Sequence, residues 1–366
     1  MRPIIALGIF LAATTLPAQQ QPGPQPAAPA AQQPVPTAQQ PAPNAPPAVS
    51  QPLTTEAKVV TLYATVRDKH NSLISNLSQS DFTVSEDNRP QKITYFRRET
   101  DLPLTVGVMV DTSLSQRHVI GSERTASSAF FDHVLRPDKD KAFLMHFDYD
   151  AELLEDITDS REKLKAALAD LQTPDFDQMR SSRDGGPRRR GGTVLYDSIY
   201  LASNELMKKQ QGRKAVVLLT DGVDRGSKVT ITEAIESALR ADTAVYAIYY
   251  ADPDESRSSY AGNRGGYGGR GGSRGGGRYP SQEQRPDGKK ILERIARETG
   301  GRFYQVSKKE SVDEIYTQLE DELRKQYALA YTPDRPHPGA GFHMLAVTAG
   351  NKDLTVQSRD GYYSDK

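Results

Sequence analysis

Apolar and polar residues alternate with a period of two where the foldable part of the chain begins. Residues 59–66 place an apolar side chain at nearly every second position, and two shorter alternating segments surround Phe82 and Ile93. This period is typical of strands with one buried face. We expect a turn at 88–90, and residues 56–100 therefore predict a small β-rich module. It offers few residues to bury, so we expect it to pack against another part of the chain.

A different rhythm begins at Leu104, where wholly apolar strands alternate with segments of helical periodicity. The expected strands are 104–110, 142–147, 152–157, 215–219, 244–250 and 303–306. The expected helices are 118–135, 160–171, 193–206, 232–241, 289–299 and one that begins at Ser311. Wholly apolar strands are typical of parallel sheets that are buried on both faces. The alternation predicts an α/β fold with a doubly wound, mainly parallel sheet over residues 102–325.

Strand-like segments return near the C-terminus, at 327–331, 344–348 and 354–357. We expect residues 326–366 to complete the sheet that residues 56–100 begin. Both ends of the folded region would then build one small flanking β module beside the α/β domain.

The first 55 residues are unlike the rest. Residues 1–18 carry Arg2, then an apolar run, then the small residue Ala18, and this pattern is typical of a signal peptide. An uncleaved anchor or a buried helix are the alternatives. Residues 19–55 are rich in Gln, Pro and Ala and predict a disordered linker. We therefore expect an exported protein, periplasmic, at the cell surface or extracellular, with no transmembrane span in the mature chain.

The amino-acid composition excludes several classes of partner and of reactive site. The 47 basic and 47 acidic residues balance to a formal net charge of zero, which argues against a protein that coats nucleic acid or a membrane surface. The chain has no cysteine, so it has no disulfide, no thiolate metal site and no thiol nucleophile. No nucleophile elbow or phosphate-binding loop is present either. We therefore expect no enzymatic activity.

Polar residues gather where the expected strands end. The first buried strand is followed by Asp111-Thr112-Ser113-Leu114-Ser115, a later helix is preceded by Thr193, and another strand ends in Thr220-Asp221-Gly222. In open α/β sheets such positions lie at one edge. Oxygen ligands with few carboxylates suit Mg²⁺, with Mn²⁺ or Ca²⁺ as alternatives, and leave a position for a partner's carboxylate.

This arrangement resembles the metal-ion-dependent adhesion site of von Willebrand factor type A domains. The resemblance covers roughly residues 102–330 and rests on five positions: Asp111, Ser113, Ser115, Thr193 and Asp221. It implies that Ser113 and Ser115 bind the cation directly, that Asp111 and Asp221 act directly or through water, and that Thr193 joins when a ligand is engaged. It also implies a partner protein that contributes an acidic side chain.

The flanks are similar to a bacterial exported subfamily of these proteins. The resemblance rests on residues 81–87 and 91–93 near the start, and on 327–331 and 359–363 near the end. It implies that flanking strands frame the central domain.

Each feature also has a plainer interpretation. Asp111 and the two serines are common helix-capping residues. The arginines at 180–190 form either a solvated loop or a basic rim beside the metal, and in the second case Arg188, Arg189 and Arg190 contact an acidic partner. A Gly/Arg-rich stretch at about 254–286 predicts a flexible insertion, although segments of this composition also bind RNA nonspecifically.

The leading hypothesis is a metal-dependent adhesion or assembly module that captures a carboxylate of another protein. The first alternative is a structural component of the cell envelope whose metal site is vestigial. The second is an exported protein that binds polyanions or RNA through its Arg-Gly segments. We expect no specific nucleic acid partner.

Overall fold

The computed structural model describes residues 59–98, 102–173, 192–250, 287–335 and 340–364. These residues all belong to one unit, Thr55–Lys366. Four features expected from the sequence lie outside the described residues: the signal peptide, the linker at 19–55, the insertion at 254–286 and the arginines at 188–190.

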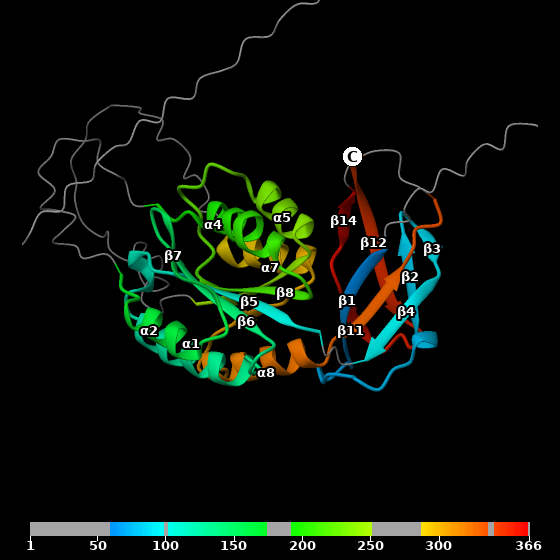
Figure 1. Ribbon diagram of the computed structural model, residues 1–366, viewed down its shortest axis with the longest axis horizontal. Helices are drawn as coiled ribbons and strands as arrows, with labels where there is room; N and C mark the ends of the chain where they lie inside the picture. The colour runs from blue at the N-terminus through cyan, green and yellow to red at the C-terminus, as the bar shows by residue number, and fades with distance from the viewer. Residues whose placement is uncertain (1–58, 99–101, 174–191, 251–286, 336–339, 365–366) are drawn as a thin grey trace, which may run out of the picture. The chain divides into compact units, whose positions relative to one another are not determined.

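A six-stranded sheet in the order β10-β9-β8-β5-β6-β7 forms the centre of the larger domain (Figure 1). Its strands are β5 (Leu104–Asp111), β6 (Lys141–Phe147), β7 (Ala151–Thr158), β8 (Arg213–Thr220), β9 (Thr243–Tyr249) and β10 (Phe303–Gln305). Only the edge strand β7 is antiparallel to its neighbour. The chain adds β6 and β7 on one side of β5, and β8, β9 and β10 on the other. The predicted doubly wound, mainly parallel α/β fold is therefore confirmed.

Helices cover both faces of this sheet (Figure 1). One face carries α1 (Ile120–Val134), α2 (Arg161–Ala169) and α8 (Val312–Arg324). The other carries α4 (Leu195–Leu201), α5 (Ile231–Arg240) and α7 (Gly288–Thr299). Ser160, Thr230 and Ser311 precede α2, α5 and α8, and the side chain of each accepts a hydrogen bond from the first turn of its helix. These bonds satisfy amides that have no partner within the helix.

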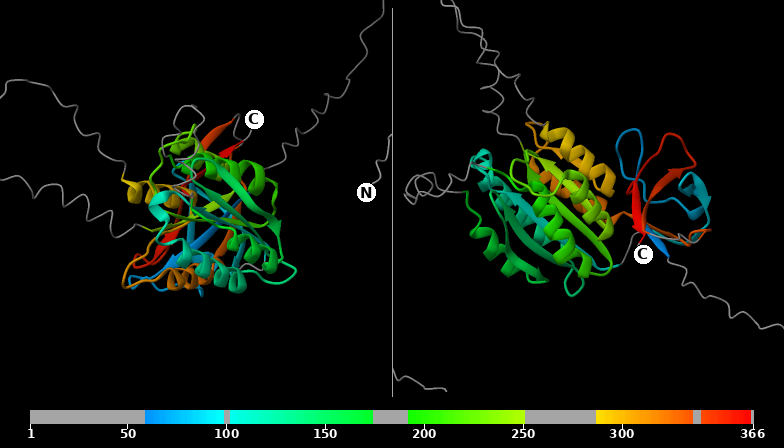
Figure 2. Two further views of the ribbon diagram at one scale, coloured as in Figure 1. Left: turned by 90° about the vertical axis from the view of Figure 1, so that its left-hand side faces the viewer. Right: turned by 90° about the horizontal axis from the view of Figure 1, so that it is seen from above.

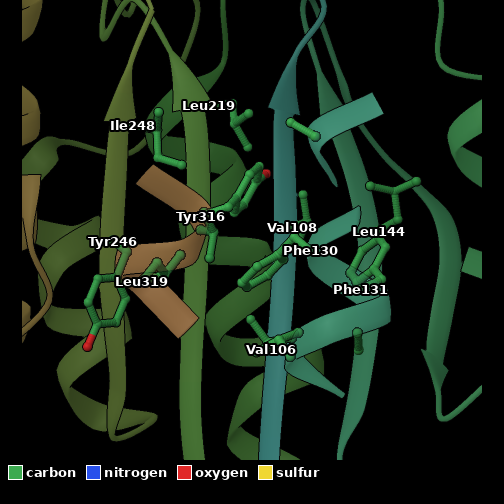
Figure 3. Packing of buried hydrophobic residues seen from close by; sticks show 14 of the residues in the cluster. Val106, Val108, Phe130, Phe131, Leu144, Leu219, Tyr246, Ile248, Tyr316 and Leu319 are labelled. Carbon is green, nitrogen blue, oxygen red and sulfur yellow. The ribbon is translucent and has the colours of Figure 1, made fainter. Parts of the chain in front are cut away.

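Alternate residues of β5 supply the two halves of the core. Val106 and Val108 face α1 and α8, where they join Phe130 and Leu319 (Figure 3), whereas Met109 joins the core on the opposite face. All eight residues of β5 are buried, which explains why the sequence shows a continuous apolar run here rather than an alternation.

A glycine in β5 makes room for an aromatic ring of the neighbouring strand. Gly107 pairs with Phe143 of β6, and a Cβ atom at Gly107 would lie 2.1 Å from the Cζ atom of that ring. The ring of Phe143 therefore packs closely over the strand at the one residue without a side chain.

The smaller module contains two four-stranded antiparallel sheets, in the orders β13-β1-β11-β4 and β14-β12-β2-β3. Their strands are β1 (Val60–Arg67), β2 (Phe82–Glu86), β3 (Arg89–Gln91), β4 (Ile93–Arg98), β11 (Tyr327–Tyr331), β12 (Gly341–Ala349), β13 (Thr355–Gln357) and β14 (Gly361–Ser364). Strands from the start of the folded region (blue and cyan) pair with strands from its end (orange and red) in Figure 2. The expected β module from both ends is confirmed.

The prediction of a turn at residues 88–90 is wrong, because residues 89 and 90 belong to a strand. Arg89–Gln91 form β3, and the reversal occurs at Asp87 and Asn88, whose φ angles are 48° and 63°. Two successive residues with positive φ make the tight turn that suits a twisted hairpin, and Asp and Asn tolerate this conformation. Pro90 is accommodated because β3 is an edge strand.

A buried ion pair connects the β module to the α/β domain. Glu322 of α8 is fully buried; its Oε2 atom accepts hydrogen bonds from the Arg67 guanidinium at the end of β1 and from the Tyr304 hydroxyl, the latter at 3.0 Å. A second contact joins Arg359, which precedes β14, to Asp242, which precedes β9. The β module thus contacts the amino-terminal edge of the parallel sheet.

We predict that Glu322→Gln lowers the free energy of unfolding by about 3–5 kcal/mol, because it leaves the buried Arg67 guanidinium without a counter-charge. Urea unfolding followed by circular dichroism measures the change. Asp321→Asn is the matched control on the same helix, since Asp321 forms an exposed pair with Lys325 and such pairs contribute little. Equal unfolding midpoints for the two variants would contradict the prediction.

Candidate metal centre

Asp111 is the last residue of β5, and its carboxylate is fully buried. Its Oδ2 atom accepts a hydrogen bond of 2.6 Å from the Thr220 hydroxyl, and its Oδ1 atom accepts one of 2.9 Å from the Ser113 amide. Val110 pairs with Leu219 in the parallel β5–β8 ladder, so Asp111 and Thr220 emerge side by side. The winding of the sheet reverses between these two strands, which is where α/β proteins place their ligands.

The two serines of the loop after β5 lie together. The Oγ atoms of Ser113 and Ser115 are 2.9 Å apart. The loop is held at its start by the Thr112 amide, which donates to the Phe147 carbonyl at the end of β6 at 3.0 Å. A short 3-10 turn, Leu114–Gln116, follows Ser113. The structure therefore brings Asp111, Ser113 and Ser115 close together, and their role as metal ligands stays a prediction.

Asp221 follows β8 directly and acts on Asp111 through its charge. Burial is the larger cause and the Asp221 carboxylate the second, and together they raise the pKa of Asp111 to about 7 against the hydrogen bonds from Ser113 and Thr220. The loop turns sharply here because Gly222 has a φ of 75°, and a Cβ atom at this residue would lie 2.4 Å from the Gly288 carbonyl oxygen. The buried Asp111 and the half-buried Asp221 thus lie at the ends of neighbouring strands, at the same edge of the sheet.

Main-chain hydrogen bonds hold Thr193 at the same edge of the sheet. Its carbonyl oxygen accepts hydrogen bonds from the amides of Arg225 and Gly226, at 3.0 and 3.2 Å, on the loop that follows Asp221. The next amide, of Val194, donates to the Asp148 carbonyl after β6 at 2.9 Å. Among the described residues, no hydrogen bond joins the Thr193 side chain to Asp111, Ser113, Ser115 or Asp221. The loop is therefore placed beside the site without a direct side-chain bond to it.

Sequence reasoning missed Glu123. This residue of α1 is fully buried, and neither oxygen of its carboxylate has a hydrogen-bond partner among the described residues. Burial first, and then the charge of Asp111, raise the pKa of Glu123 well above its usual range. A signal was available, because Glu123 precedes the buried Ala126 and Phe130 by three and seven residues and so lies on the buried face of the helix.

The donor set fits a hard divalent cation. Asp111, Asp221 and the two serine hydroxyls offer only oxygen atoms, and few of these are charged, which suits Mg²⁺ and its retained waters. A bound cation would relieve the repulsion between the two carboxylates.

Within the described part of the chain, no helix is both long and apolar enough to cross a membrane.

Residues 106–223 match the family model of the von Willebrand factor type A domain. These residues of the α/β domain therefore belong to the von Willebrand factor type A family, whose domains are protein-interaction modules, and the resemblance of the α/β domain to this family is confirmed. The search of curated proteins finds no match to this chain.

Solved structures with similar folds include two from Bacteroides. One is a conserved hypothetical protein BatB from Bacteroides thetaiotaomicron, with 17% sequence identity and a TM-score of 0.40; the match covers 60% of this chain and 97% of that chain. The other is an aerotolerance-related membrane protein from Bacteroides fragilis, with 19% sequence identity and a TM-score of 0.40; the match covers 60% of this chain and 98% of that chain. Proximal thread matrix protein 1 from the mussel byssus, solved with zinc in its metal-ion-dependent adhesion site, is 15% identical with a TM-score of 0.41, covering 65% and 50%.

We predict that Asp111→Asn changes how stability depends on pH in the metal-free protein. The pKa of Asp111 rises on folding from 3.8 to about 7, so between these values the folded state binds more protons at this position than the unfolded state. Its contribution to the free energy of unfolding therefore falls as pH rises through this window, by roughly 4 kcal/mol in total.

Urea unfolding in the presence of EDTA, at pH values from 4 to 8, measures this contribution as the stability of the wild type minus that of Asp111→Asn. The difference should decrease as pH rises and level off above about pH 7. Asp353→Asn, at an exposed position, should give a profile parallel to the wild type. A pH-independent difference for Asp111→Asn would rule out the elevated pKa.

Proposed function

We propose that this protein is an exported binding module that captures a carboxylate of a partner protein through a divalent cation held by Asp111, Ser113, Ser115, Thr193 and Asp221. The observation that carries the proposal is the meeting of Asp111, Ser113 and Ser115 beside Thr220 and Asp221, at the point where the sheet reverses its winding.

Each residue has a distinct part in this proposal. The hydroxyl oxygens of Ser113 and Ser115 are direct ligands, while Asp111 and Asp221 supply negative charge directly or through water. Thr193 lies on the loop beside Asp221 and joins the site when a partner is engaged. A bound Mg²⁺ with few anionic ligands supplies an electrophilic position that accepts an outside carboxylate.

Thr220 positions the site in this proposal rather than binding the cation. Its hydroxyl donates to Asp111 and also accepts a hydrogen bond of 3.0 Å from the Gly222 amide. One side chain therefore fixes both the orientation of the Asp111 carboxylate and the start of the loop that carries Asp221. Such outer partners orient the ligands of metal sites.

A binding role rather than a catalytic one follows from the same donor set. Asp111 and Asp221 surround the proposed cation, so neither is left as a free general acid or base. The signal-peptide pattern at residues 1–18 and the linker at 19–55 support export. Mn²⁺ and Ca²⁺ are alternative occupants, because both accept oxygen ligands.

We predict that the Ser113→Ala/Ser115→Ala double variant binds Mn²⁺, used as a probe for Mg²⁺, at least tenfold more weakly than the wild type, because two direct ligands are lost. Isothermal titration calorimetry measures the affinity. Ser128→Ala, in α1 and only partly buried, is the control and should bind as the wild type does. Unchanged Mn²⁺ affinity in the double variant would overturn the site assignment.

Partner capture provides the functional test. The full chain on a resin should retain envelope proteins in Mg²⁺ and release them in EDTA, and amidation of the carboxylates in the extract should prevent retention. The double variant should retain none of these proteins. Retention that persists in EDTA would instead support a structural component with a vestigial metal site.

A further inference from the structure

Thr112 stands between two of the proposed ligands and is fully buried. The Oδ1 atom of Asp111 accepts a hydrogen bond of 2.9 Å from the Ser113 amide, and this bond closes a ring whose middle residue is Thr112. A change in the backbone angles of Thr112 therefore turns the Asp111 carboxylate and the Ser113 hydroxyl relative to each other. Whatever fixes Thr112 also fixes the spacing of these two oxygen ligands.

Two hydrogen bonds from the end of β6 fix Thr112. Its amide donates to the Phe147 carbonyl at 3.0 Å, which extends the parallel β5–β6 ladder beyond the pair of Asp111 and Phe147. Its hydroxyl oxygen lies 3.0 Å from Nδ1 of His146. Any residue except proline can form the first bond, so only the second depends on the side chain at this position.

Glu152 orients the imidazole of His146 from the other side. Nε2 of His146 lies 3.3 Å from Oε2 of Glu152, its cross-strand partner in β7. An ionised carboxylate only accepts hydrogen bonds, so Nε2 carries a hydrogen and Nδ1 of the neutral ring accepts one from the Thr112 hydroxyl. In a protonated ring Nδ1 donates instead, and the hydroxyl can accept. The contact with Thr112 therefore exists in both protonation states.

Packing alone does not call for an imidazole at position 146. His146 lies on the same face of the sheet as Leu144, because side chains alternate along β6. Leu144 belongs to the apolar core on this face, whereas His146 does not and its side chain is 18% exposed. Both of its ring nitrogens have polar partners instead, and one of these partners lies in the proposed metal loop.

The end of β6 also holds the loop of Thr193. The amide of Val194 donates to the Asp148 carbonyl at 2.9 Å. Residues 146–148 thus bind the hydroxyl and the amide of Thr112 on one side and the main chain beside Thr193 on the other. This short segment therefore sets the spacing between the two loops that carry the proposed hydroxyl ligands.

We propose that His146 is a positioning residue of the metal site at Asp111. Through the Thr112 hydroxyl it fixes the loop that carries Ser113 and Ser115, without binding the cation itself. This inference rests on the proposed function, because it requires a cation at that loop. Outer residues that orient metal ligands contribute about ten- to hundredfold in metal affinity. His146 acts through the main chain of Thr112 and not directly on a ligand, so we expect the lower end of this range.

Isothermal titration calorimetry of the full chain with Mn²⁺ tests the proposal. Thr112→Val removes the hydroxyl but keeps the branched shape, and it should bind Mn²⁺ about tenfold more weakly than the wild type. Thr112→Ser keeps the hydroxyl and should regain most of the affinity. His133→Gln, at an exposed histidine, is the control and should match the wild type.

Two variants of His146 separate hydrogen bonding from bulk. The amide of asparagine lies near the place of Nδ1 and can still accept from the Thr112 hydroxyl, whereas the amide of glutamine lies near the place of Nε2. His146→Asn should therefore bind Mn²⁺ more tightly than His146→Gln, although glutamine is closer to histidine in size. The double variant Thr112→Val/His146→Gln should be no weaker than the weaker single variant, since both changes break the same bond.

The outcomes distinguish this inference from the proposed function. If Thr112→Val is folded and binds Mn²⁺ as the wild type does, while Ser113→Ala/Ser115→Ala binds it more weakly, only the role of His146 is overturned. Additive losses in the double variant would also overturn that role. A wild type that binds no Mn²⁺ would overturn both. If Thr112→Val does not fold, the two His146 variants decide, and equal affinities would contradict the proposal.

Discussion

A carboxylate buried at the end of the central strand is the constraint on which the functional edge of this protein depends. Burying a charge is costly unless neighbouring groups compensate it. Asp111 receives two hydrogen bonds, from Thr220 and Ser113, and these offset only part of the cost, since its pKa still rises to about 7. The surrounding loops are therefore organised around a carboxylate whose ionised form a nearby positive charge would stabilise.

The two edges of the parallel sheet make different contacts. The amino-terminal edge meets the β module, through Arg67 and Glu322 and through Arg359 and Asp242. The carboxyl-terminal edge carries Asp111, Asp221 and the loop of Thr193. Because packing between the modules occupies one edge only, the loops at the other edge are free of that contact. This division follows from the direction of the strands, since parallel strands place all their ends of one kind together.

The sequence predicts most of the fold because its strongest signals are local. The wholly apolar runs of β5 and β8 indicate strands buried on both faces, and Asp111, Ser113 and Ser115 lie within five residues of one another. The pair of Arg67 and Glu322 has no such signal, because its members are 255 residues apart. Glu123 was missed because a glutamate in a helix usually lies on the solvated face. Only its spacing of three residues from the buried Ala126 indicates that it lies on the buried face. Pro90 indicated a turn, but an edge strand accommodates it equally well.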